Sequence, residues 1–253
     1  MALSPELTPR QKFVVAISNA LERGRTPLLI VIGAAIVVVI VFAIYTQIAG
    51  ARADKAAGLA AAIQTNFSSW SSETDKTKKA DLQKTLTGEI DAVVKKYPRS
   101  YGAQRALFIR ADMAYEEKDW KNAITDYQLV AKRFAASYLA PVCLANAAAA
   151  AEQAGDKKQA IALDQQILDF KGLTPEIPRA LFSLGRLSEE TDNTKEAQIY
   201  YNQLVNTYPS SGWTNLARDR IIYLAAKASA AGSPQTKVPA TQGAAKSSSS
   251  SGN

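Results

Sequence analysis

The chain has 253 residues, 47% of them hydrophobic and 21% charged, which is enough for one substantial folded domain with appendages. It has one cysteine, Cys143, and no histidine, so an intramolecular disulfide, a classical zinc site and a histidine-based catalytic triad are excluded. The first 26 residues and the lysines from Lys227 onward carry most of the net charge of +7, and the nearly neutral remainder argues against nucleic-acid binding.

Residues 1–26 are predicted to be a cytoplasmic segment. Within residues 8–23, four apolar side chains share one helical face with basic residues beside them, which is typical of a short amphipathic helix on a membrane surface. A loose cytoplasmic tail fits the same sequence equally well. The apolar residues are Phe13, Val14, Ile17 and Leu21.

Residues 27–49 are predicted to form one transmembrane helix. Their centre, from Leu28 to Tyr45, is almost wholly apolar, and a helix needs about 20 such residues to cross the bilayer core. A cleaved signal peptide is the competing interpretation, but its apolar core would be shorter and closer to the N-terminus.

The charges that flank the span predict its orientation. Four basic residues precede it and two follow closely, so the positive-inside rule places the N-terminus in the cytoplasm and the remaining residues on the far side. The basic residues are Arg10, Lys12, Arg23 and Arg25 before the span, and Arg52 and Lys55 after it.

Residues 50–85 are predicted to be a helical linker and a degenerate repeat, and residues 86–230 a helical repeat domain. The repeat is visible as an exact spacing of 37 residues, which is the signature of an α-solenoid built from helical hairpins. Three sets of equivalent positions define it: Leu107, Leu144 and Leu181; Ala111, Ala148 and Gly185; Ala123, Ala160 and Ala197.

Caps and breakers recur with the same period. Asp119, Asp156 and Asn193 suit the N-terminus of each second helix. Tyr97, Phe134 and Tyr208 mark the ends of second helices, and the motif at 171–175 is expected to be a looser turn. Helices are therefore predicted near 76–96, 101–117, 119–133, 138–154, 156–169, 176–191, 194–207 and 212–230.

Three further expectations concern composition. Cys143 is expected to be a small buried apolar residue, and Trp120 and Trp213 to be core or capping residues. Residues 231–253, rich in Ala, Gly and Ser, are predicted to be a disordered tail.

The pieces at 110–137 and 183–211 resemble tetratricopeptide repeats. That family has a small residue midway along the first helix, an alanine early in the second, and an aromatic residue four positions later. Tyr127 and Tyr201 match the aromatic position, but Asp164 departs from it. The resemblance implies an all-α solenoid of about three and a half helical hairpins, and it is specific for fold and weak for function.

The whole layout is similar to the YfgM-like family of ancillary subunits of the bacterial Sec translocon. The string at 100–124 carries this resemblance, together with the short first segment, the single span and the repeats. It implies a periplasmic domain that works beside the translocon and a membrane-anchored periplasmic chaperone.

First helices of such repeats line a concave groove, and the register projects a mixed set of charged and aromatic side chains into it. This mixture suits a peptide or an unfolded segment, although ordinary solvated helix faces would give the same pattern. The projected binding residues are Arg105, Phe108, Asp112, Tyr115, Asn146, Glu152, Arg179, Phe182, Arg186 and Glu189.

The sequence contains no phosphate-binding glycine loop, nucleophile elbow or metal-ligand cluster, so no enzyme activity, catalytic residue, metal or cofactor is predicted. The predicted function is a membrane-anchored scaffold for protein partners, which are translocon subunits, a periplasmic chaperone or exported polypeptides. Two alternatives remain open: a structural scaffold for envelope assembly or division, and a ligand-binding accessory of a transporter.

Overall fold

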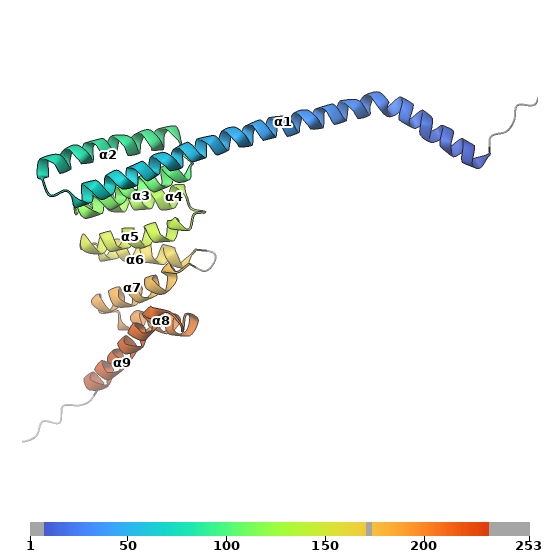
Figure 1. Cartoon of the computed structure of the whole chain (residues 1–253). Coiled ribbons are helices and arrows are strands. Elements are labelled where there is room, and N and C mark those ends of the chain that lie inside the picture. Colours follow the sequence, from blue (N-terminus) through green and yellow to red (C-terminus); the bar gives the residue numbers. More distant parts are fainter. Residues whose placement is uncertain (1–7, 171–173, 233–253) are drawn as a thin grey trace, which may run out of the picture. The chain divides into compact units, whose positions relative to one another are not determined.

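The computed structural model describes residues 8–170 and 174–232, and every regular element in these ranges is a helix. The chain divides into two compact units between Lys118 and Asp119 (Figure 1). The first unit contains α1 (Pro9–Ser72), α2 (Lys76–Lys96) and α3 (Tyr101–Glu116). The second contains α4 (Trp120–Arg133), α5 (Leu139–Gln153), α6 (Lys157–Leu168), α7 (Glu176–Glu190), α8 (Thr194–Thr207) and α9 (Gly212–Gly232).

Helix α1 is one continuous helix of 64 residues. The amphipathic segment 8–23, the apolar span 27–49 and the first part of the linker at 50–85, which were predicted separately, are therefore parts of a single element. Residues 29–48 are all exposed, and most of their side chains are apolar. Helix α1 is long and apolar enough to cross a membrane. Figure 1 shows a bend in α1 toward its N-terminal end.

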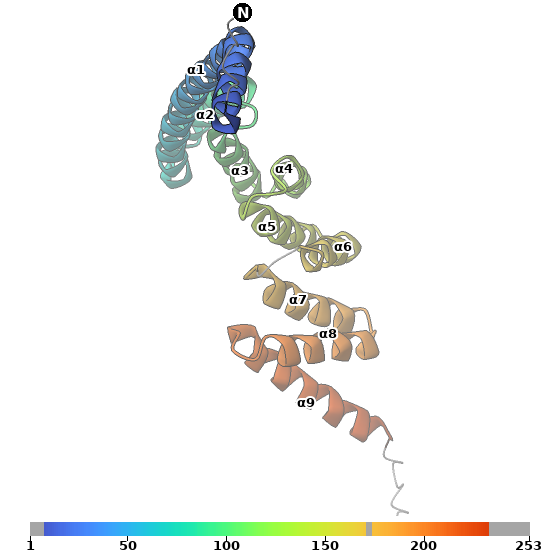
Figure 2. The same cartoon turned by 90° about the vertical axis from the view of Figure 1, so that its right-hand side faces the viewer.

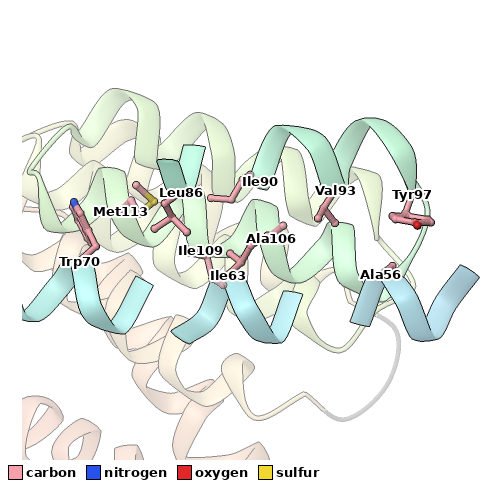
Figure 3. Packing of buried hydrophobic residues seen from close by; sticks show 10 residues of the cluster. All are labelled: Ala56, Ile63, Trp70, Leu86, Ile90, Val93, Tyr97, Ala106, Ile109 and Met113. Carbon is pink, nitrogen blue, oxygen red and sulfur yellow. The ribbon is translucent and has the colours of Figure 1, made fainter. Parts of the chain in front are cut away.

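Beyond the apolar stretch, the same helix becomes a core element of the first unit. It packs against α2 and α3, which also pack against each other. Its buried residues recur at helical spacing, and Figure 3 shows them facing side chains of the other two helices. The cluster consists of Ala56, Ile63 and Trp70 from α1, Leu86, Ile90 and Val93 from α2, Tyr97 at its end, and Ala106, Ile109 and Met113 from α3.

The close approach of α1 and α3 depends on Gly102. A Cβ atom at this position would lie 2.2 Å from the backbone oxygen of Ala56, which is closer than any real contact. The absence of a side chain at Gly102 therefore allows the two helices to touch through their backbones.

In the second unit, each helix from α4 to α9 packs against the next, and α5, α7 and α9 also touch in sequence (Figure 2). This is the packing of stacked helical hairpins, in which first helices form one layer and second helices the other. Cys143 lies fully buried in α5, as predicted.

The predicted capping residues are confirmed at all three second helices. The side chains of Asp119, Asp156 and Asn193 each accept a hydrogen bond from the backbone amide three residues later. Tyr97 and Tyr208 end α2 and α8 with nearly the same backbone angles. The sequence period therefore fixes the helix boundaries as well as the core.

One periodic feature was not expected from the sequence. Lys118, Gly155 and Asp192 all have positive φ angles, of 60°, 79° and 60°, and they are spaced by 37 residues. Each directly precedes the residue that caps a second helix. The hairpin turn thus uses a left-handed residue at this point in every repeat.

Some expectations fall outside the described residues. The predicted tail lies there from residue 233 onward, and so do residues 171–173 of the looser turn and residues 1–7 of the first segment.

Candidate functional site

All ten projected groove residues are half-buried on first helices of the hairpins. Four of them, Arg105, Phe108, Asp112 and Tyr115, belong to α3 in the first unit. Arg105 donates a hydrogen bond of 2.7 Å to Oε1 of Gln64 in α1, and its guanidinium lies 5.3 Å from the centre of the Phe108 ring. In the first unit, therefore, α1 lies beside the projected face of α3 and contacts it through Gln64.

The other six belong to the second unit, where the structure brings four of them together. Glu152, Arg179, Phe182 and Arg186 line one hollow with a volume of about 150 Å³. Asn146, on α5, is not among the residues that line it. The side chains come from two neighbouring first helices, α5 and α7, so the projected register is consistent with their positions.

A second hollow, with a volume of about 440 Å³, lies further along α7. Phe182 and Arg186 border it as well, together with Glu189 from the projected set. Its other walls come from α8 and α9, which supply Tyr201, Arg220, Tyr223 and Lys227.

Arg186 connects α5 with α7. It forms an ion pair with Glu152 of the preceding hairpin, and Nη1 lies 2.7 Å from Oε1 of Glu190. Lys157 extends the network through a contact of 2.9 Å to Glu190. Burial opposes the charge on Arg186, but the two carboxylates outweigh it and raise its pKa above the ordinary value.

The next hairpin repeats this arrangement with a phenol included. Glu189 of α7 is paired with Arg220 of α9, and the hydroxyl of Tyr201 donates a hydrogen bond of 2.7 Å to Oε1 of Glu189. Burial opposes ionisation of Glu189, yet the hydrogen bonds from Arg220 and Tyr201 lower its pKa. Burial, followed by the contact with Glu189, raises the pKa of Tyr201, so it stays protonated.

Gly185 makes room for the Tyr201 ring. A Cβ atom at Gly185 would lie 2.4 Å from Cε1 of Tyr201, whose side chain is completely buried. The small residue expected in the first helix and the aromatic residue expected in the second therefore form one packing unit.

Asp164 occupies the equivalent position in the preceding hairpin, 37 residues before Tyr201, and it is only 3% exposed. Burial raises its pKa from the ordinary 3.8 to about 7, a shift that the nearby Ser183 hydroxyl opposes. Glu152 raises the pKa further, while Arg179 and Arg186 lower it. Asp164 lines the smaller hollow.

Asp164 and Trp213 are among the wall residues of the smaller hollow that sequence reasoning missed. The departure of Asp164 from the repeat pattern was the signal that could have identified it. Trp213 is not a core residue, because it is 36% exposed, and it lines the smaller hollow. Trp213 lies on the first turn of α9, where its ring centre is 5.4 Å from that of Phe182.

The described residues contain no group of three or more acidic, histidine or cysteine side chains that could hold a metal ion. The arrangement instead offers half-buried charges, aromatic rings and hydrogen-bonding groups on a helical surface. Such a surface is suited to holding a polypeptide or a small ligand.

A family model described as "Tetratricopeptide repeat" matches residues 105–137 and 179–211. A "TPR repeat-containing protein" of Treponema pallidum (strain Nichols) is 35% identical over 115 residues, which are 44% of this chain and 46% of that protein. The chain thus spans about half the length of this curated relative.

The two matched segments begin 74 residues apart, which is twice the 37-residue period. The hairpin of α5 and α6 lies between them in the same register. The chain is therefore an all-α solenoid with tetratricopeptide repeats and one long apolar N-terminal helix. Repeats of this kind typically serve as non-catalytic scaffolds for protein interaction.

Proposed function

We propose that this protein is a membrane-anchored scaffold whose repeats hold a polypeptide partner on the extracytoplasmic side of a bacterial inner membrane. The observation that carries the proposal is the convergence of Glu152, Arg179, Phe182 and Arg186 on one hollowed surface of the second unit. Tetratricopeptide repeats supply the general role in protein interaction, and this surface is the place where a partner would bind.

The anchor is the apolar part of α1. Residues 27–49 would cross the membrane, and Ala56, the first buried core residue of the first unit, follows only seven residues later. At 1.5 Å per residue the separation is about 10 Å along the helix. The first unit would therefore lie close to the membrane surface, joined to it by a continuous helix.

The orientation rests on the charges beside the span. The excess of arginine and lysine before residue 27 favours an N-terminus in the cytoplasm, with the second unit and the part of the first unit that follows the span outside it. In a bacterium with two membranes this compartment is the periplasm.

The partner class rests on the resemblance to YfgM-like translocon subunits. We infer that the scaffold assists the Sec translocon or a periplasmic chaperone in handling exported proteins. The resemblance covers the span and the repeats together, which is why it favours secretion over a general scaffold.

Purification of the full-length protein from its native membranes in a mild detergent tests this proposal. Repeated enrichment of translocon subunits or periplasmic chaperones, relative to an unrelated single-span protein, is the expected result. Enrichment of envelope-assembly or division proteins would replace the secretion role with a structural one. Enrichment of a transporter would replace it with a ligand-binding role.

A further inference from the structure

The hairpins α5–α6 and α7–α8 differ at two positions of one packing contact. In the later hairpin, Tyr201 fills the space beside Gly185 and its hydroxyl reaches Glu189. In the earlier hairpin, Ala148 stands at the position of Gly185 and Glu152 at that of Glu189, both 37 residues earlier. The tyrosine is missing, because Asp164 replaces it.

The replacement leaves space. A hollow of about 150 Å³ lies beside Asp164, with Ala148 and Glu152 in its lining and the rings of Phe182 and Trp213 as walls. An apolar cavity of about this volume can accept one benzene ring. The space available here therefore matches a single aromatic side chain.

The replacement also leaves an unused hydrogen-bond acceptor. Oδ2 of Asp164 is buried and has no hydrogen-bond partner among the described residues. A buried polar atom without a partner is costly, and a bound group that donates a hydrogen bond would remove that cost.

Charge decides which donor fits. Asp164 and Glu152 contribute negative charge to the hollow, and Arg179 and Arg186 contribute positive charge. The arginines are themselves paired, Arg179 with Glu176 and Arg186 with Glu152. Neither a free cation nor a free anion would find a strong excess of opposite charge, so a neutral ring that carries a hydroxyl is favoured.

We propose that this hollow anchors a tyrosine side chain of a bound polypeptide, with the ring packed against Phe182 and Trp213 and the hydroxyl donating to Asp164. The bound ring would supply the aromatic group that Tyr201 supplies in the later hairpin, and it would come from a partner because α6 carries Asp164 at that position. The inference rests on the proposed function, because it names the side chain by which the scaffold would hold its partner.

The test uses the full-length protein in lipid nanodiscs, labelled with 5-fluorotryptophan and titrated with p-cresol, which is the side chain of tyrosine. Trp213 lines the hollow, and Trp70, fully buried in the first unit, serves as an internal control in the same fluorine spectrum. The Trp213→Phe variant assigns the resonance.

A saturable shift of the Trp213 resonance alone is expected, with toluene binding at least about tenfold more weakly, because toluene lacks the hydroxyl that would donate to Oδ2 of Asp164. Equal affinities for p-cresol and toluene would overturn the role of Asp164. A response to n-butylammonium stronger than that to p-cresol would show that the hollow is a cation site and overturn the proposal.

Asp164→Tyr restores the repeat residue and should fill the hollow and abolish the p-cresol shift. Ala149→Leu offers a second way to fill the same hollow if Asp164→Tyr fails to fold. Ala162→Leu, an exposed position on α6, adds similar bulk elsewhere and should leave the titration unchanged. An unchanged p-cresol shift in a folded filled variant would contradict the proposal.

The same variants separate this inference from the proposed function. If Asp164→Tyr loses the co-purified partner while Ala162→Leu keeps it, the anchor is supported. If both variants keep the partner, the scaffold function stands and the tyrosine anchor is wrong. If wild-type protein binds p-cresol but captures no partner, the hollow exists as proposed and the scaffold function fails.

Discussion

Gly185 and Tyr201 show how a single small residue determines the packing of a hairpin. The buried ring lies where a side chain at Gly185 would be, and its hydroxyl is fixed by Glu189. The ring therefore cannot move away without losing a buried hydrogen bond. Pairs of this kind are rigid because two constraints act on the same side chain.

Gly185→Ala is accordingly expected to lower the free energy of unfolding by about 1–3 kcal/mol, because the added methyl group overpacks the contact with Tyr201. Gly88→Ala is the matched control, since a Cβ atom at Gly88 meets nothing within 4 Å on the exposed face of α2. It should raise stability by about 0.5–1 kcal/mol. Chemical denaturation measures both, and a neutral Gly185→Ala would show that the ring relaxes freely.

Asp164 makes stability depend on pH. Its pKa is raised from 3.8 to about 7 by burial, and of the facing groups Glu152 reinforces the shift while Ser183, Arg179 and Arg186 oppose it. The folded state therefore binds more protons than the unfolded state. Its stability is fully present below about pH 4 and declines as the pH rises toward 7.

Asp164→Asn removes this titration. Relative to wild type, the variant should gain free energy of unfolding between pH 5 and pH 8, with an upper limit of about 4 kcal/mol set by three pKa units. Lowered pKa values at Glu189 and Glu190 act in the opposite direction, but they are common to both proteins and cancel in the difference. Parallel stability curves over this range would mean that Asp164 stays ionised.

At the scale of the elements, a turn residue with positive φ precedes each capped second helix. Glycine adopts this conformation without strain, whereas a residue with a side chain pays about 1–2 kcal/mol for it. Only the middle repeat has glycine there, at Gly155, and the other two use Lys118 and Asp192. The turns therefore keep the same backbone with different side chains.

Opposite effects are expected from exchanging these residues. Gly155→Ala should lower the free energy of unfolding by about 1 kcal/mol, and because a Cβ atom there meets nothing within 4 Å, backbone strain is the sole cause. Lys118→Gly should be neutral or stabilise by up to about 1 kcal/mol. Thermal unfolding of both variants checks the signs, and a destabilising Lys118→Gly would show that chain entropy dominates this turn.

The helices could be predicted closely from sequence, because caps, breakers and small residues all recur with one period. The predicted range 194–207 coincides with α8, and 176–191 differs from α7 by one residue. The continuity of α1 was harder to predict, because its amphipathic, apolar and alanine-rich parts follow different patterns although none breaks the helix.

The candidate site was only partly predictable. The register placed Glu152, Phe182 and Arg186 on the correct helices, since the spacing of residues on a helix is fixed. The hollow exists because Asp164 is smaller than the tyrosine at the equivalent position, and one of its walls is the ring of Trp213 from α9. Neither follows from the periodicity of one helix, so both required the structure.

At the scale of the whole molecule, the chain joins an apolar helix able to cross a membrane to stacked helical repeats. The apolar helix is itself a core element of the first unit, where Ile63 and Trp70 are buried. We propose that this continuity keeps the scaffold at the membrane surface while the second unit presents its hollows to a partner.

In-cell photo-crosslinking tests this account most directly, with p-benzoylphenylalanine placed at single positions of the full-length protein. Asn146 belongs to the projected groove and Tyr223 borders the second hollow, whereas Ile199 and Leu129 are exposed positions on second helices. The account predicts discrete polypeptide adducts from the first pair and none from the second. Equal adducts from both pairs, or adducts from the second pair alone, would contradict a groove that holds a polypeptide.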